Sequence, residues 1–248
     1  INGICMGGGL GLSIFASHRV VTENLVLAMP ETGIGFFPDV GASYFLPRLP
    51  GAIGMYMALT GQRINAADAL YCGIATHYCP SAALSSLSVE LQKITDLSQI
   101  DAIIAGVESK LAQVSLLEAH RSSIDECFGA PGVIEIIEKL KSHPDQKWAA
   151  HTLKQLLSKS PTSLFETFKA MTRGATQSLP EALQSDFDLT MRFVRSKDFT
   201  EGVRAVLFHK DNKPKWNPAT VEEAFKNRDH LLHEVYHPTP RRICWPPQ

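Results

Sequence analysis

The sequence predicts an α/β layered unit over residues 1–83, followed by a mainly helical region. In the first part, short runs rich in β-branched and aliphatic residues alternate with short helix-like runs, as is typical of strands covered by helices. From Leu84 onward, apolar residues recur almost entirely at helical spacing. Three consecutive glycines, Gly7, Gly8 and Gly9, separate the first strand-like run from the first helix-like run. They indicate that something must approach the backbone closely there.

Local patterns predict the elements of the first part in order. A short helix opens at the glycines over residues 10–18, and prolines interrupt a partly helical segment over residues 40–51. Two further helices, over residues 52–61 and 65–73, each end on a glycine, as helices commonly do. Buried strands are predicted where β-branched and aliphatic residues gather, in residues 1–6, 18–23, 25–31 and 73–79.

Helices dominate the predicted region from residue 84 to 218. Apolar side chains recur at helical spacing over residues 133–141. Another helix is predicted over residues 160–171, with Ser160 as its N-cap and Pro161 at its first position. The predicted organisation is therefore a partial α/β core over 1–83, a helical region over 84–218 and a tail over 219–248.

Two more segments complete the helical region. A long helix over residues 179–196 carries apolar side chains three or four positions apart, namely Leu183, Phe187, Met191 and Val194. Residues 201–218 predict a short helix followed by a turn rich in lysine and proline. The lysines of this turn, Lys210, Lys213 and Lys215, are compatible with contacts to phosphate groups and equally with a solvated turn.

Composition excludes several classes of protein. The chain has 248 residues and a formal net charge of −1, which gives no electrostatic reason to expect nucleic acid or a membrane surface as partner. No uninterrupted apolar run approaches the roughly 20 residues needed to cross a bilayer. The five cysteines are odd in number and form no CxxC pair, so we expect reduced, buried thiols rather than a zinc ribbon or a redox pair.

The chain opens directly on an apolar strand-like run, without an initiator methionine or a targeting segment. We therefore expect it to be the C-terminal part of a longer protein. Localisation cannot be read from a sequence of this kind, because a transit peptide would lie upstream of Ile1.

The three glycines fit neither common nucleotide motif. A dinucleotide fingerprint starting at Gly7 would need its third glycine at Leu12, and no Gly-Lys-Ser/Thr follows as in a P-loop. A strand, exposed backbone N–H groups and a helix N-terminus remain, and this arrangement suits an oxyanion. The alternative is that the glycines only let the helix pack tightly on the sheet, and this stretch alone does not decide between the two.

Two carboxylates follow a predicted strand. Glu31 comes directly after Pro30, and Asp39 follows eight residues later. Burial would raise the pKa of such carboxyl groups toward working pH, and two of them in one pocket can divide the roles of base or nucleophile and acid. Taken singly, Glu31 also fits a helix-start carboxylate and Asp39 a turn residue after proline, and these structural readings are favoured.

Together these segments resemble the enoyl-CoA hydratase/isomerase (crotonase) superfamily, and most of all its branch of 3-hydroxyisobutyryl-CoA hydrolases. The resemblance rests on GICMGGGLGLS, LAMPETGIGFFPDVGASYFLPRLPG, ALTGQRINAADALYCGIATHYC, SPTSLFETFKAM and EGVRAVLFHKDNKPKW, which run in order to about Pro218. It implies a spiral of ββα turns, here without its N-terminal part, and C-terminal helices that in this superfamily often mediate homo-oligomers.

The resemblance also implies roles for individual residues. Gly8, flanked by Gly7 and Gly9, matches the glycine whose N–H polarises the acyl-CoA thioester carbonyl. The family's hydratases carry a glutamate where this chain has Gly11, while their second glutamate corresponds to Glu31. The hydrolase branch pairs that glutamate with an aspartate, here Asp39. We therefore expect hydrolysis of a small 3-hydroxyacyl-CoA from valine breakdown, with Glu31 either attacking the carbonyl or activating water.

The same resemblance sets the remaining expectations. No cofactor and no metal is expected, because CoA is part of the substrate. The family's location is the mitochondrial matrix, with the peroxisome as the alternative. The family's other oxyanion donor lies upstream of Ile1, so we expect this chain by itself to be inactive or poorly folded.

Three alternative functions remain open. One is enoyl-CoA hydratase/isomerase activity, and another is a non-catalytic subunit with the same fold. The third is a zinc hydrolase, because His233, Glu234 and His237 form a literal HExxH match. Pro238 disfavours helix at His237, and no His, Asp or Glu follows as a further ligand, so a coincidental match in the tail is favoured.

Overall fold

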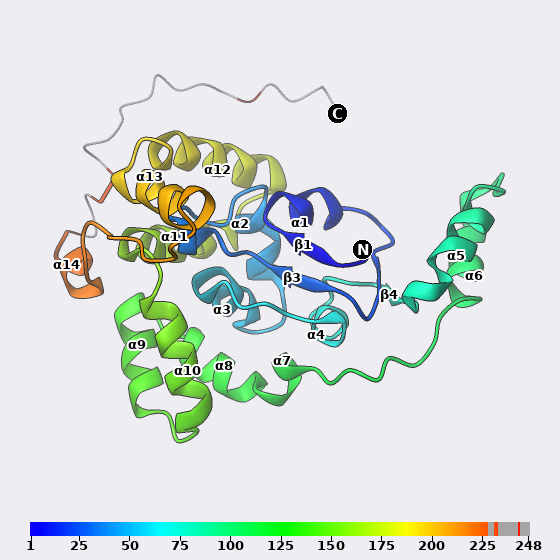
Figure 1. Cartoon of the computed structure of the whole chain (residues 1–248), viewed down its shortest axis with the longest axis horizontal. Helices are drawn as coiled ribbons and strands as arrows, with labels where there is room; N and C mark the ends of the chain where they lie inside the picture. The colour runs from blue at the N-terminus through cyan, green and yellow to red at the C-terminus, as the bar shows by residue number, and fades with distance from the viewer. Residues whose placement is uncertain (228–230, 233–242, 244–248) are drawn as a thin grey trace. The chain divides into compact units, whose positions relative to one another are not determined.

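The computed structural model describes residues 1–227, 231–232 and 243 (Figure 1). Contacts divide the chain into two compact units. Unit 1 comprises residues 1–28 and 63–121, and unit 2 comprises residues 29–62 and 122–248. Each unit thus combines two segments that are separated in the sequence. The predicted domain boundaries at residues 83 and 218 are not tested by this division and stay predictions.

Unit 1 holds the strands. β1 (Ile4–Met6) pairs in parallel with β3 (Val26–Ala28), and β2 (Val20–Val21) pairs in parallel with β4 (His77–Tyr78). All four predicted strands are confirmed, although each is shorter than its run of apolar residues. Parallel pairing needs a crossover between the partners. α1 (Gly8–Ser13) lies in the connection from β1 to β3, where the sequence predicted a short helix that opens at the glycines.

The remaining elements of unit 1 are short helices joined by capped turns. Asn65 and Asp68 form a reciprocal capping box at the start of α4. Asp68 is also buried and accepts hydrogen bonds from the Ser115 hydroxyl and the Leu117 N–H, which ties α7 to α4. Besides α1, the helices of this unit are α4 (Ala66–Tyr71), which precedes β4, and then η3 (Ser81–Ala83), α5 (Leu84–Leu91), η4 (Leu97–Gln99), α6 (Ile100–Ala105) and α7 (Leu116–Ala119).

The described part of unit 2 consists of helices and loops. Ser160 caps α11 through its side chain and Pro161 stands at the first helical position, both as predicted. Figure 1 shows α9 and α10, which pack against each other, in green. In chain order the elements are η1 (Glu31–Ile34), α2 (Ala42–Phe45), η2 (Leu46–Arg48), α3 (Ile53–Thr60), α8 (Arg121–Phe128), α9 (Val133–Ser142), α10 (Gln146–Leu157), α11 (Pro161–Gly174), α12 (Leu179–Phe193), α13 (Lys197–Val203), the π-helix η5 (Arg204–Phe208) and α14 (Val221–Lys226).

An aromatic cluster lies directly after η1. Phe36 and Phe37 are buried, and their ring centroids lie 5.5 Å and 5.4 Å from that of Phe193. Phe199 of α13 packs on the same cluster, with its ring centroid 5.2 Å from that of Phe36. Such offset and edge contacts stabilise beyond the buried area itself. The cluster fixes the chain between η1 and α2 against helices that come more than 150 residues later.

The buried face of α12 includes a carboxylate. The side chains that lie fully inside are Ala182, Asp186 and Phe193, whereas Val194 is 41% exposed. Of the apolar side chains at helical spacing, Leu183, Phe187 and Met191 are partly buried and Val194 is exposed. The helix is rotated so that one carboxylate, Asp186, faces inward.

The thiols agree with the expectation of reduced cysteines. Cys5, Cys72, Cys79 and Cys127 are free and buried, and Cys244 lies outside the described residues. Within the part of the chain that the structure describes, no helix has the length and apolar content to cross a bilayer.

Two glycines let α13 lie directly on η1. A Cβ on Gly202 would lie 2.2 Å from the carbonyl carbon of Ile34, and one on Gly35 would lie 2.2 Å from the carbonyl oxygen of Asp198. Gly35 also has a φ of 69°, which side-chain-bearing residues rarely adopt. The turn that begins at Glu31 is thus held by backbone-to-backbone contact.

We expect Gly202→Ala to destabilise the chain by about 1–3 kcal/mol, because neither backbone in this contact can move aside cheaply. Gly33→Ala is the matched control in the same turn. Its new methyl would meet only the flexible end of Lys159, 3.7 Å away, so we expect a change within about 0.5 kcal/mol. Urea unfolding of the three proteins measures the difference, and equal midpoints would show that the contact at Gly202 can relax.

Candidate active site

The glycine triplet joins β1 to α1 in unit 1. Gly7 is the N-cap residue, with φ 50° and ψ −119°, a conformation that favours glycine. Gly8 and Gly9 form the first turn, where helix N–H groups have no partner within the helix. A Cβ on Gly8 would meet no atom within 4 Å, and one on Gly9 would lie 3.8 Å from the Cys5 sulfur. Tight packing therefore does not explain the glycine at position 8, and the open space beside it suits a bound group.

Glu31 is the first residue of η1 in unit 2. Its side chain is 8% exposed, and its Oε2 atom is buried without a hydrogen-bond partner in the described part of the chain. Burial raises the pKa of the Glu31 carboxyl to about 8, and the charge of Asp39 raises it further. A buried carboxyl with one unsatisfied oxygen is unusual, because such groups normally find partners.

Asp39 lies in the loop between η1 and α2. It is half-buried, and burial raises the pKa of its carboxyl. The two residues that follow, Val40 at φ 54° and Gly41 at φ 84°, are both left-handed. This conformation is rare for a β-branched residue such as Val40, and the backbone strain lowers the stability of the fold by on the order of 1–3 kcal/mol. The structure thus brings Glu31 and Asp39 together in unit 2 and holds Asp39 on a strained turn.

Asp186 of α12 is a third carboxylate of this site, and the sequence analysis missed it. It is 4% exposed, and it accepts hydrogen bonds from the Gly41 N–H at 3.0 Å and the Ser43 hydroxyl at 2.6 Å. Burial raises the pKa of Asp186 to about 6 against the lowering effect of these hydrogen bonds, and the charge of Asp39 raises it too. In the sequence, its burial is indicated by its helical spacing from two apolar residues, since Asp186 follows Ala182 by four positions and precedes Phe193 by seven.

A cavity of about 160 Å³ lies beside Ser43 and Asp186. Its charged lining is balanced, since three cationic and three acidic side chains border it. These are Glu166, Lys169, Arg173, Asp186, Asp188 and Arg192. Because the charges balance, the cavity does not by itself select an anion or a cation.

These carboxyl groups define what the site can do. Glu31, with its raised pKa, is mostly neutral near pH 7, and its ionised fraction is a strong base or nucleophile for a carboxylate because it is poorly solvated. Asp39 can serve as a second polar group beside it. In the described residues no cluster of three or more His, Cys, Asp or Glu side chains could hold a metal ion. His233, Glu234 and His237 lie outside the described residues.

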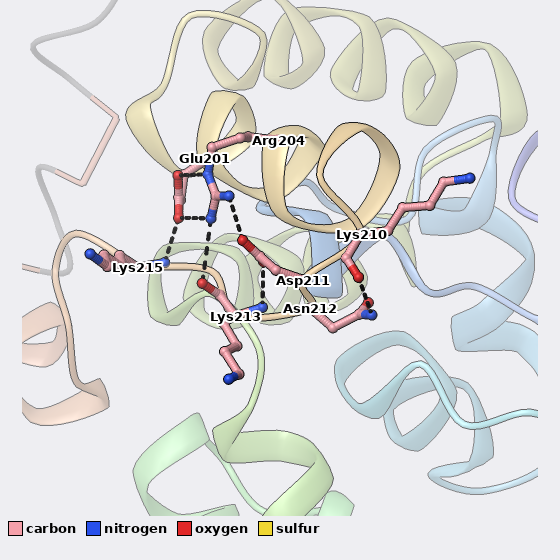
Figure 2. A network of polar contacts seen from close by, with 7 residues as sticks. All are labelled: Glu201, Arg204, Lys210, Asp211, Asn212, Lys213 and Lys215. Atoms are coloured by element: carbon pink, nitrogen blue, oxygen red, sulfur yellow. Dashed lines mark hydrogen bonds and ion pairs between the residues drawn. The ribbon is translucent and has the colours of Figure 1, made fainter.

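The basic segment near residue 210 is organised by a polar network (Figure 2). Arg204 binds Glu201 through two nitrogens, both at 2.8 Å, and reaches Asp211 at 2.6 Å. Backbone N–H groups of Lys213 and Lys215 donate to Asp211 and Glu201. These contacts fix the backbone of the turn.

The lysine ammonium groups take no part in that network. Figure 2 shows the side chains of Lys210, Lys213 and Lys215 extending in different directions. Three diverging charges do not form one phosphate cradle, so the geometry favours the solvated turn over a phosphate site.

The chain belongs to the enoyl-CoA hydratase/isomerase family, whose model matches residues 1–229. Among curated proteins it is 44% identical over 231 residues to human 3-hydroxyisobutyryl-CoA hydrolase, mitochondrial, covering 90% of this chain and 59% of the relative. The corresponding protein of Dictyostelium discoideum is 42% identical over 226 residues, with the same coverage. The chain thus spans about three-fifths of the length of these relatives.

Solved structures confirm the predicted crotonase fold. A carnitinyl-CoA dehydratase from Mycobacterium thermoresistibile superimposes with a TM-score of 0.87 at 36% identity, covering 98% of this chain and 68% of that one. An enoyl-CoA hydratase from Rhodobacter sphaeroides gives a TM-score of 0.80 at 34% identity, covering 93% and 66%.

Proposed function

We propose that the protein hydrolyses a small 3-hydroxyacyl-CoA thioester, with 3-hydroxyisobutyryl-CoA as the first substrate to test. The observation that carries the proposal is the buried Glu31 carboxyl, which has an unsatisfied oxygen and a pKa raised to about 8 beside a second carboxylate. Relatives 42–44% identical to the chain are named for this reaction, which favours the thioester over other acyl substrates.

In the proposed reaction the thioester oxygen binds the N–H of Gly8, with Gly7 and Gly9 shaping the backbone around it. Negative charge that develops on this oxygen is stabilised by the backbone dipole. Ionised Glu31 then either attacks the carbonyl carbon, forming an anhydride and expelling the CoA thiolate, or takes a proton from a water molecule that attacks. Asp39 binds the 3-hydroxyl group or carries a proton. Both routes consume one water and yield the 3-hydroxy acid and CoA thiol.

A second candidate is hydration or isomerisation of an enoyl-CoA. It is supported by the two solved structures above, which are a dehydratase and a hydratase. Against it stands Gly11, which occupies the place of the first glutamate that the resemblance implies for hydratases. Hydration by a pair of glutamates at those two positions is therefore not available to this chain.

The resemblance to the family sets the remaining parts of the proposal. The substrate would be an acyl-CoA, no cofactor would be required, and the C-terminal helices would mediate a homo-oligomer. We place the protein in the mitochondrial matrix, since the human and Dictyostelium relatives are named mitochondrial, with the peroxisome as the alternative.

Thiol release distinguishes the two candidates. The protein translated from its complete transcript is incubated with 3-hydroxyisobutyryl-CoA, and free thiol is followed with a chromogenic disulfide. A parallel reaction with crotonyl-CoA follows loss of the enoyl absorbance. Hydrolase activity predicts thiol release from the first and no absorbance loss from the second. Absorbance loss without thiol release would replace the hydrolase proposal with the hydratase one.

Labelled water separates the two hydrolytic routes. In a single turnover in ¹⁸O water, label enters Glu31 only if its carboxylate has formed the anhydride and water then opens it at the glutamyl carbonyl. General-base attack puts all of the label in the product acid, as does opening of the anhydride at its acyl carbon, so label in Glu31 is the diagnostic result. Mass spectrometry of the peptide that contains Glu31 reads the result.

Substitution of Gly8 tests the proposed oxyanion donor. We expect Gly8→Ala to lower kcat/KM by on the order of 10²-fold, since a methyl group would occupy the space beside the N–H. The chain should lose no stability, because that methyl meets no atom of the described chain within 4 Å. Gly106→Ala, at another helix end of unit 1, is the control for a glycine replacement without effect on turnover. Full activity of Gly8→Ala would remove Gly8 from the mechanism.

A further inference from the structure

The turn that carries Asp39 is not self-supporting. Val40 and Gly41 are left-handed in succession. The turn has a local hydrogen bond, from the Ala42 N–H to the Asp39 carbonyl at 2.9 Å. Many relaxed turns have the same hydrogen bond, so it does not account for the left-handed backbone. Left-handed backbone at a β-branched residue persists only where the surroundings hold it. Something outside the turn must therefore fix its conformation.

Asp186 supplies that support from another helix. One carboxylate oxygen accepts from the Gly41 N–H and the other from the Ser43 hydroxyl, so one buried group binds both the left-handed Gly41 and the first turn of α2 that follows it. The side chain is 4% exposed and comes from the middle of the 15-residue helix α12. A buried carboxylate with both oxygens bound is a fixed point rather than a mobile contact.

Resting on the proposed function, we propose that Asp186 is a positioning residue, which clamps the strained turn at Val40 and Gly41 and so fixes Asp39 beside Glu31. It does not touch the substrate. Its effect on the reaction passes through Asp39, whose carboxyl would otherwise sample several places as the turn relaxed. Displacement of a polar group by about 1 Å can lower turnover by 10²-fold.

Two other aspartates of unit 2, the buried Asp198 and the half-buried Asp125, do not share this arrangement. Asp198 accepts from the Ser160 hydroxyl and the Asn217 N–H, away from residues 39–43. Asp125 accepts from the Ala52 N–H at 2.8 Å and holds the start of α3. Asp125 is therefore a matched control, because it too bonds a backbone N–H of a distant segment that carries no proposed site residue.

The decisive experiment is a double-mutant cycle on thiol release by the protein from its complete transcript. Asp186→Ala is expected to lower kcat by about 10–100-fold, with KM changed less. In an Asp39→Asn background the same change is expected to cost less than about 2-fold, because the group that it positions is already gone. An equal loss in both backgrounds would overturn the proposal, since Asp186 would then act independently of Asp39.

A conservative variant separates positioning from charge. Asp186→Asn keeps an oxygen for the Gly41 N–H, and its amide can donate to the Ser43 oxygen. It is expected to retain kcat within about 3-fold while Asp186→Ala does not, as two preserved hydrogen bonds predict. Asp125→Ala controls for general loss of stability and should leave kcat unchanged.

Hydrogen exchange tests the clamp without any turnover. In Asp186→Ala, exchange of the Gly41 amide is expected to speed up by at least about 10-fold relative to the parent, while Asp186→Asn and Asp125→Ala leave it unchanged. Unchanged exchange in Asp186→Ala would overturn the proposal. If the parent releases no thiol, the hydrolase function fails, and this exchange measurement alone decides whether Asp186 holds the turn.

Discussion

Glu31→Gln is expected to abolish thiol release and, at pH 7, to make the folded chain more stable. The loss of turnover should reach at least about 10³-fold, since glutamine can neither attack the carbonyl nor take a proton. The gain in stability has a separate cause. The folded protein has to bury a carboxyl whose pKa is raised from 4.5 to about 8, and glutamine removes this cost.

The pH dependence of that gain follows from linkage. Below pH 4.5 the carboxyl is protonated in both folded and unfolded chains, so Glu31 costs nothing through ionisation. As pH rises toward 8, the unfolded chain loses the proton first, and each pH unit costs the fold about 1.4 kcal/mol. The parent is therefore destabilised by on the order of 3 kcal/mol at pH 7, and the cost is constant above pH 8.

Urea unfolding of parent and variant at pH 4.5 and pH 7 measures this difference. The free energies of unfolding should be nearly equal at pH 4.5 and diverge in favour of Glu31→Gln at pH 7. Glu90→Gln is the control, because its side chain is 52% exposed and paired with Lys93 on the surface. A variant that is inactive but no more stable at pH 7 would mean that Glu31 is better solvated than its burial indicates.

The second large effect is the pH profile of the reaction. Only the ionised form of Glu31 can act as base or nucleophile, so kcat/KM should rise tenfold per pH unit up to about pH 8 and then level off. Activity at pH 6 should thus be about 100-fold below the plateau. Initial rates of thiol release between pH 5.5 and 9.5, corrected for hydroxide-driven hydrolysis, provide the profile.

Asp39→Asn should move that profile rather than only lower it. The charge of Asp39 contributes to the raised pKa of Glu31, so its removal lets Glu31 ionise at lower pH and shifts the rising limb to lower pH. The direction of the shift is independent of how much activity the variant retains. A limb that stays in place would show that the two carboxyl groups do not interact in the working enzyme.

Much of the fold was predictable from local chemistry. The strands at residues 4–6 and 26–28 follow from β-branched and aliphatic runs, and the N-cap Ser160 with Pro161 fixes the start of α11. Gly61 ends α3 in a left-handed conformation, as its place in the sequence predicted. These signals lie within a few residues of the structure that they specify, which is why one sequence suffices to read them.

The candidate site was predictable only in part. Glu31 and Asp39 stand close together in the sequence and are recognisable as a pair, although their roles stay predictions. Asp186 was not recognisable, because a carboxylate in the middle of a long helix is normally solvated. Its burial depends on how α12 is rotated against residues more than 140 positions earlier, which the sequence of the helix alone does not specify.

The separation between Asp39 and Asp186 has a consequence for the protein during its synthesis. A ribosome adds roughly 5–20 residues per second, so on the order of ten seconds pass between the translation of Asp39 and that of Asp186. During this interval the turn at Val40 and Gly41 has no partner for the Gly41 N–H from α12. The nascent chain therefore cannot yet hold Asp39 in its final place, and the reaction proposed for these carboxylates would have to await the docking of α12.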